Sequence, residues 1–96
     1  MKDTYQVYLI SDSTGETLDR IFMALKAQFK DFKYKINQFS FTRTENQINQ
    51  ILEKAKIENS IILYTIVDNK LAKFLTEESN KKNIPCFGVL GDLILS

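Results

Sequence analysis

The chain has 96 residues, enough for one small domain with a core of its own. Its 13 basic and 12 acidic residues nearly cancel, so the net charge of +1 gives no reason to expect nucleic acid or a membrane surface as partner. The chain contains no histidine, which excludes a Ser-His-Asp triad or a histidine-ligated metal site within it. No apolar run approaches the ~20 residues of a membrane span. With the single cysteine, Cys86, unable to form an internal disulfide, the sequence predicts a cytoplasmic protein without a metal.

Four segments have the composition of β-strands. Residues 5–10 and 35–41 are rich in aromatic and β-branched side chains, and residues 60–67 form a continuous apolar run typical of a strand buried on both faces. A fourth strand is expected over residues 85–90. Residues 91–95 then form a Gly-Asp turn and the start of an apolar element that the sequence does not finish, which we interpret as the mark of a truncated domain.

The segments between these strands have the spacing of amphipathic helices. They cover residues 18–29, 48–55 and 71–82. Short loops and helical crossovers imply parallel strands with helices on both faces of the sheet. The sequence therefore predicts a single α/β domain over residues 1–96, a small doubly wound parallel sheet of about four strands (βαβαβαβ). It would be flavodoxin-like or Rossmann-like, with the strand order 2-1-3-4.

Each expected helix has a candidate N-terminal cap. Ser13 and Glu16 precede the first helix at the spacing of a capping box, in which two side chains each accept a backbone N–H from the other residue. Thr44 and Gln47 repeat this spacing before the second helix. Asp68 precedes the third, where a carboxylate oxygen can accept free N–H groups of the first turn.

The carboxyl ends of the strands are the expected place for a ligand in an open α/β sheet. After the first strand, the sequence SDSTGET offers four hydroxyl groups and a glycine that lets the backbone approach a ligand closely. The helix that follows would direct free N–H groups and its positive dipole end at this first loop, which suits phosphate or another anion. The candidate ligand-binding residues are Ser11, Asp12, Ser13, Thr14, Gly15, Glu16 and Thr17.

Charged residues leave the chemistry of this site open. Asp12 and Glu16 oppose an anion unless a metal or an arginine compensates, and Arg43, after the second strand, is the best candidate for that role. Asp68 follows the third strand and would either serve the site, as a metal ligand, a base or a hydroxyl-positioning group, or cap the third helix. The first loop would otherwise be a plain capped turn with surface hydroxyls. We assign no catalytic residue.

Four motifs in succession resemble one family. The first strand and loop read YLISDSTGET, Arg43 follows the second strand, the third strand ends in ILYTIVD, and the fourth reads IPCFGVLGDLI. In this order, and over essentially the whole chain, they are similar to the N-terminal portion of the pyruvate, phosphate dikinase regulatory protein family.

The resemblance implies a bifunctional enzyme. One activity would be ADP-dependent phosphorylation of a threonine on pyruvate, phosphate dikinase or phosphoenolpyruvate synthase, and the other would be phosphate-dependent removal of that phosphoryl group. ADP and phosphate are thus the implied ligands, and the dikinase or the synthase the implied client protein. The family's Gly-x-x-x-x-Gly-Lys-Thr loop lies later in its members and is missing from these 96 residues, so this chain is expected to be inactive alone. The first loop, Arg43 and Asp68 would shape the active cleft or dock the client.

Two other functions stay open. Thr14, Gly15 and Thr17 match the T-x-T-G-x-T loop with which flavodoxins hold the phosphate of FMN, although Asp12 would place a negative charge beside that phosphate. The chain could instead be an interaction module without chemistry that pairs with its missing half, with the client or with itself. An exposed apolar patch around residues 93–95 would favour this second alternative.

Overall fold

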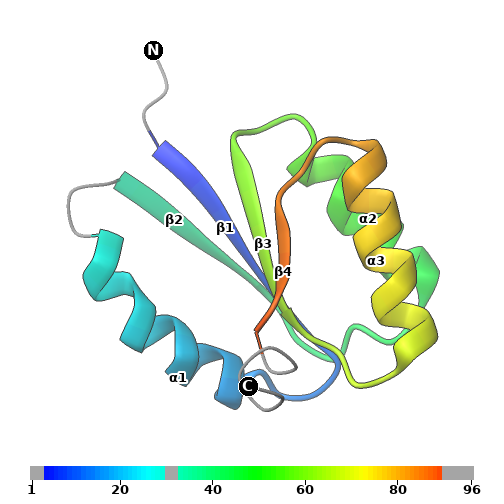
Figure 1. Ribbon diagram of the computed structural model, residues 1–96, viewed down its shortest axis with the longest axis horizontal. Helices are drawn as coiled ribbons and strands as arrows, with labels where there is room; N and C mark the ends of the chain where they lie inside the picture. The colour runs from blue at the N-terminus through cyan, green and yellow to red at the C-terminus, as the bar shows by residue number, and fades with distance from the viewer. Residues whose placement is uncertain (1–3, 30–32, 90–96) are drawn as a thin grey trace.

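The computed structural model describes residues 4–29 and 33–89 (Figure 1). Strands and helices alternate along the chain, as the apolar pattern predicts. The elements are β1 (Thr4–Ser11), α1 (Glu16–Leu25), the 3-10 helix η1 (Lys26–Phe29), β2 (Lys33–Phe39), α2 (Glu45–Ala55), β3 (Ser60–Thr65), α3 (Asn69–Lys81) and β4 (Cys86–Gly88).

The four strands form one parallel sheet in the order β2-β1-β3-β4, which confirms the expected topology. Helix α1 lies on one face of the sheet, and α2 and α3 lie together on the other (Figure 1). The doubly wound α/β fold is therefore confirmed. Because β2 lies on one side of β1 whereas β3 and β4 lie on the other, the strand order reverses at β1, and the switch point lies between the carboxyl ends of β1 and β3.

The larger part of the core fills the space between the sheet and the helices α2 and α3. Ile10 and Ile62 from the two central strands are fully buried there, together with Leu52 of α2 and Leu75 of α3. Tyr8 of β1 stacks on Phe39 of β2, with their ring centroids 5.7 Å apart. The last five residues of β1 are all buried, on both faces of the sheet, as expected for a central strand.

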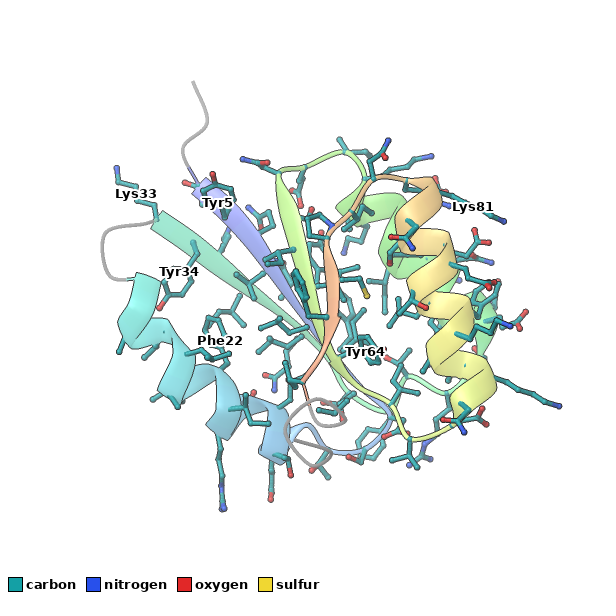
Figure 2. The ribbon with its side chains drawn as sticks, viewed as in Figure 1. Tyr5, Phe22, Lys33, Tyr34, Tyr64 and Lys81 are labelled. Carbon is teal, nitrogen blue, oxygen red and sulfur yellow. The ribbon has the colours of Figure 1, made fainter. Side chains whose placement is uncertain are left out.

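A smaller core joins α1 to the opposite face of the sheet. Leu18 and Phe22 of α1 pack on Val7, Leu9 and Leu63. Figure 2 shows Phe22 directed toward Tyr34 of β2, and the two rings meet edge to face at 5.6 Å. In the part of the chain that the structure describes, no helix is long and apolar enough to cross a membrane.

Several expected boundaries differ from the structure. Strand β2 ends at Phe39 instead of continuing to residue 41, because Phe41 turns into the left-handed region (φ 55°) and its N–H bonds to the first loop. Helix α1 begins at Glu16, two residues earlier than the apolar spacing indicates. Strand β3 ends at Thr65, short of the expected residue 67.

The end of the chain is described only in part. Strand β4 covers Cys86–Gly88, inside the expected range of 85–90. Residue 90, the turn expected at residues 91–92 and the apolar element expected at 93–95 lie outside the described residues. The predicted exposure of the last segment therefore stays a prediction.

Candidate ligand site at the carboxyl edge of the sheet

The first loop, residues 11–17, is tied to the end of β3. Ser11 is buried, and its hydroxyl oxygen accepts the N–H of Ser13 at 3.1 Å. The backbone N–H of Asp12 donates to the carbonyl of Thr65 at 3.3 Å, and Asp12 Oδ2 accepts the N–H of Val67 at 2.9 Å. These bonds hold the loop across the switch point between β1 and β3, so its hydroxyl groups are presented from a fixed backbone.

Gly15 is the N-cap of α1, with a left-handed backbone (φ 88°) and no side-chain cap. The capping box expected from Ser13 and Glu16 is therefore wrong. The Ser13 hydroxyl lies 3.2 Å from that of Ser11, and the first helical N–H, that of Glu16, donates only a long hydrogen bond of 3.4 Å to Thr14 Oγ1. A Cβ on residue 15 would lie 3.3 Å from the Ser40 hydroxyl, so both φ and space favour glycine.

The loop after β2 packs along the first loop. The N–H of Phe41 donates to the carbonyl of Ser13 at 2.9 Å, and the N–H of Thr42 donates to the carbonyl of Ser11 at 2.8 Å. The Ser40 hydroxyl donates to the carbonyl of Thr14 at 2.8 Å. The two loops thus behave as one unit, built from hydrogen bonds between residues far apart in the sequence.

Arg43 reaches the first loop, as the sequence predicts. Its Nε donates to the backbone carbonyl of Asp12 at 2.9 Å, and its guanidinium carbon lies 5.2 Å from the centroid of the Phe41 ring. Arg43 therefore places a positive charge beside the backbone of Asp12 in the first loop. Its function as a compensating charge for a bound anion stays a prediction.

Helices α2 and α3 begin differently from α1. The hydroxyl of Thr44 accepts the N–H of Gln47 at 3.1 Å, and Gln47 Oε1 accepts the N–H of Thr44 at 3.0 Å, which confirms the capping box of α2. Asp68 Oδ1 accepts the N–H groups of Lys70 and Leu71 at 2.9 and 3.1 Å. Of the two roles left open for Asp68, the structure shows the cap of α3.

The nine candidate residues are thus brought together unequally. Seven form the first loop, Arg43 joins them through a hydrogen bond, and Asp68 lies next to Val67 with its carboxylate engaged by α3. The sequence prediction missed Ser40 and Phe41, which the structure places against the first loop. It assigned both to β2 because the apolar alternation continues through them.

Metal ligands and the cysteine thiol also bear on the chemistry of the site. Within residues 4–29 and 33–89, no three Asp, Glu or Cys side chains are arranged to hold a metal ion. Burial raises the pKa of the Cys86 thiol to about 11, so Cys86 remains protonated at neutral pH. Cys86 therefore acts as a small hydrophobic residue of the fold.

The fold and the site define a class of protein: a doubly wound α/β domain of flavodoxin-like strand order whose first loop and uncapped α1 are suited to an anionic ligand. Comparison with known proteins makes this specific. A family model described as Kinase/pyrophosphorylase matches residues 7–96, and the chain belongs to this family.

Curated relatives agree with the family model. A protein of Pelagibacter ubique named "Putative pyruvate, phosphate dikinase regulatory protein" is 62% identical over 97 residues, which cover the whole of this chain and 35% of the relative. Proteins of the same name from Alkaliphilus oremlandii and Geotalea uraniireducens are 42% and 36% identical over 92% and 93% of this chain, and 32% and 33% of their own. The chain therefore spans about a third of the length of these relatives, which confirms the resemblance to this family's N-terminal portion.

Proposed function

We propose that this chain forms the N-terminal wall of the active cleft in a cytoplasmic regulator of pyruvate, phosphate dikinase or phosphoenolpyruvate synthase. That regulator would use ADP to phosphorylate a threonine of the client, and would use phosphate to remove the phosphoryl group as pyrophosphate. Membership of the kinase/pyrophosphorylase family and the names of the relatives support this proposal.

The observation that carries the proposal is the open N-terminus of α1 at the switch point of the sheet. The left-handed Gly15 begins the helix without a side-chain cap, so the N–H groups of Thr17 and Leu18 are free of side-chain acceptors within the described residues. Thr14 Oγ1 lies 3.4 Å from the backbone nitrogen of Glu16 at this helix start, Ser13 adds a hydroxyl in the same loop, and Arg43 supplies a positive charge. N–H donors, hydroxyls and a guanidinium are the groups that recognise phosphate oxygens.

The role of this wall would be to hold phosphate oxygens while transfer proceeds. Phosphoryl transfer is catalysed chiefly by positioning and by stabilisation of charge on the transferred group. These 96 residues contain no Gly-x-x-x-x-Gly-Lys-Ser/Thr sequence. We therefore propose that transfer itself requires regions found in the remaining two thirds of a family-length protein, and that the client threonine reaches the cleft across the same edge.

The test is calorimetric titration of the purified chain with pyrophosphate, with and without magnesium. Binding is expected, and Thr14→Ala should weaken it because a hydroxyl beside the helix N-terminus is lost. Thr76→Ala is a matched control, since the Thr76 hydroxyl donates to the carbonyl of Lys73 within α3 and belongs to no loop of the candidate site. If wild-type chain binds no pyrophosphate, or if both variants bind as wild type does, the first loop is not a phosphate site. A purified chain that is yellow would instead support the flavin alternative.

A second assay addresses the client. We expect the 96-residue chain alone to transfer no label from ADP to a threonine of the dikinase or the synthase. A protein of family length that carries the same N-terminal third should transfer it, and Gly15→Val in that protein should reduce the rate. Transfer by the short chain alone would contradict the proposal that transfer requires the remaining two thirds of a family-length protein.

A further inference from the structure

Phe41 is an unusual residue of the carboxyl edge. Within the described residues, Phe41 (φ 55°) and Asn83 (φ 59°) are the two non-glycine residues with left-handed backbones. Asn83 has an ordinary explanation, because it follows the end of α3, where the N–H of Ile84 bonds to the carbonyl of Ser79 and asparagine is well tolerated. Phe41 follows no helix, and the residue is 51% exposed. An aromatic residue there costs free energy through both its backbone and its exposure.

Hydrogen bonds nonetheless hold the backbone of Phe41 in place. The Phe41 N–H donates to the carbonyl of Ser13 at 2.9 Å, and the Phe41 carbonyl accepts a long hydrogen bond of 3.4 Å from Gln47 Nε2. The guanidinium of Arg43 lies over the ring and is itself anchored through Nε to the carbonyl of Asp12. The result is a half-exposed ring whose backbone is bonded to the first loop and over which a cation lies.

We propose that Phe41, backed by Arg43, is a stacking platform for the base of a nucleoside diphosphate whose phosphates lie at the first loop. The proposal rests on the function proposed above and adds the part of the ligand that the first loop alone does not recognise. Bases stack on exposed aromatic side chains, and a guanidinium strengthens such stacks. Because the Phe41 backbone is bonded to Ser13, one ligand can contact both the ring and the hydroxyl groups of the first loop.

The remaining donors of Arg43 fit this arrangement. Within the described part of the chain, Nε is the one guanidinium nitrogen of Arg43 that makes a hydrogen bond, so the two terminal nitrogens are available to phosphate oxygens. Phe41 and Arg43 would then divide the nucleotide between them, with the ring taking the base and the guanidinium facing the phosphates.

The test compares ADP with pyrophosphate, which has the phosphates but no base. Wild-type chain, Phe41→Ala, Phe41→Trp and the control Phe87→Ala are titrated with each ligand, and thermal melting verifies that each variant folds. Phe87 is matched to Phe41, being 51% exposed on β4 and away from the first loop. Phe41→Ala should weaken ADP binding about tenfold and leave pyrophosphate binding unchanged. Phe41→Trp should retain ADP binding, and Phe87→Ala should affect neither ligand.

The outcomes separate this proposal from the function on which it rests. If wild-type chain binds pyrophosphate, but ADP binds no more tightly or is unaffected by Phe41→Ala, the platform is wrong and the phosphate site stands. Equal weakening of both ligands by Phe41→Ala would show that Phe41 only supports the loop, and would also overturn the platform. If neither ligand binds wild-type chain, both proposals fail for these residues. Unchanged ADP binding by Phe41→Ala with weaker client binding would assign the ring to a peptide instead.

Discussion

The N-termini of α1 and α3 both lie at the carboxyl edge of the sheet, yet they are built in opposite ways. At α3, the Asp68 carboxylate accepts two N–H groups of the first turn, so the helix satisfies its own donors. At α1, the chain enters through a left-handed glycine, Gly15, and no side chain caps the helix. A glycine at the N-cap makes a helix less stable than a capping side chain does, by about a few tenths of a kcal/mol. The fold therefore forgoes stabilisation at α1, where the hydroxyl groups and Arg43 gather.

This difference separates a structural helix start from one that is available to a ligand. The N–H groups of α3 are already bonded, so an anion would have to displace Asp68 to reach them. Those of α1 need no such displacement. Glu16 and Asp19 in the first turn of α1 interact favourably with its positive end, and they set a limit on how strongly that end attracts an anion.

Gly15→Val should have the largest effect, because it acts on the backbone that opens α1. Valine is strained at φ 88°, and its Cβ would lie 3.3 Å from the Ser40 hydroxyl. We expect the free energy of unfolding to fall by about 2 kcal/mol. We also expect pyrophosphate binding to become too weak to detect. Denaturant unfolding and calorimetry measure the two effects.

Asp92→Ala is the comparison for Gly15→Val. It removes a carboxylate of the Gly-Asp turn predicted from the sequence, which lies outside the described residues. We expect it to leave pyrophosphate binding largely intact. If the two variants impair binding equally, the first loop is a plain turn and the contrast between the helix starts has no functional meaning.

Asp68→Ala tests the other side of the comparison. Removing the cap of α3 should lower the free energy of unfolding by about 1 kcal/mol and leave pyrophosphate binding unchanged, since the carboxylate is bonded to α3 and not to the first loop. Asp68→Asn retains an acceptor oxygen and should recover most of the stability. A loss of binding without a loss of stability would mean that Asp68 contacts the ligand.

The sequence predicts the fold well because the fold follows from local patterns. The apolar periodicity identifies the strands and helices, and the chirality of crossovers limits their arrangement. The cap of α2 is also local, since Thr44 and Gln47 have both the residue types and the spacing of a capping box. Ser13 and Glu16 have the same spacing but form no box. The carbonyl of Ser13 accepts a hydrogen bond from the N–H of Phe41, and a local sequence pattern cannot predict a contact between residues so distant in sequence.

The site shows the same division. The first loop can be predicted from its hydroxyl groups and its glycine. Its contact with Arg43 follows from the parallel sheet, which places the carboxyl ends of the strands at one edge. The sequence does not predict the left-handed backbone at Phe41, because phenylalanine rarely adopts a positive φ and the preceding apolar alternation favours a strand. Which of these residues contact a ligand stays a prediction.

The smallest and most diagnostic effect is expected from Asp12→Asn. The amide oxygen can still accept the N–H of Val67, so the first loop should keep its position while losing a negative charge. If the open end of α1 binds phosphate oxygens directly, loss of a nearby like charge should favour binding by about 1 kcal/mol, and pyrophosphate should bind a few-fold more tightly at low ionic strength. The gain should shrink as salt screens the interaction. Weaker binding that depends on magnesium would reverse the interpretation, because Asp12 would then hold a cation that bridges it to the phosphates.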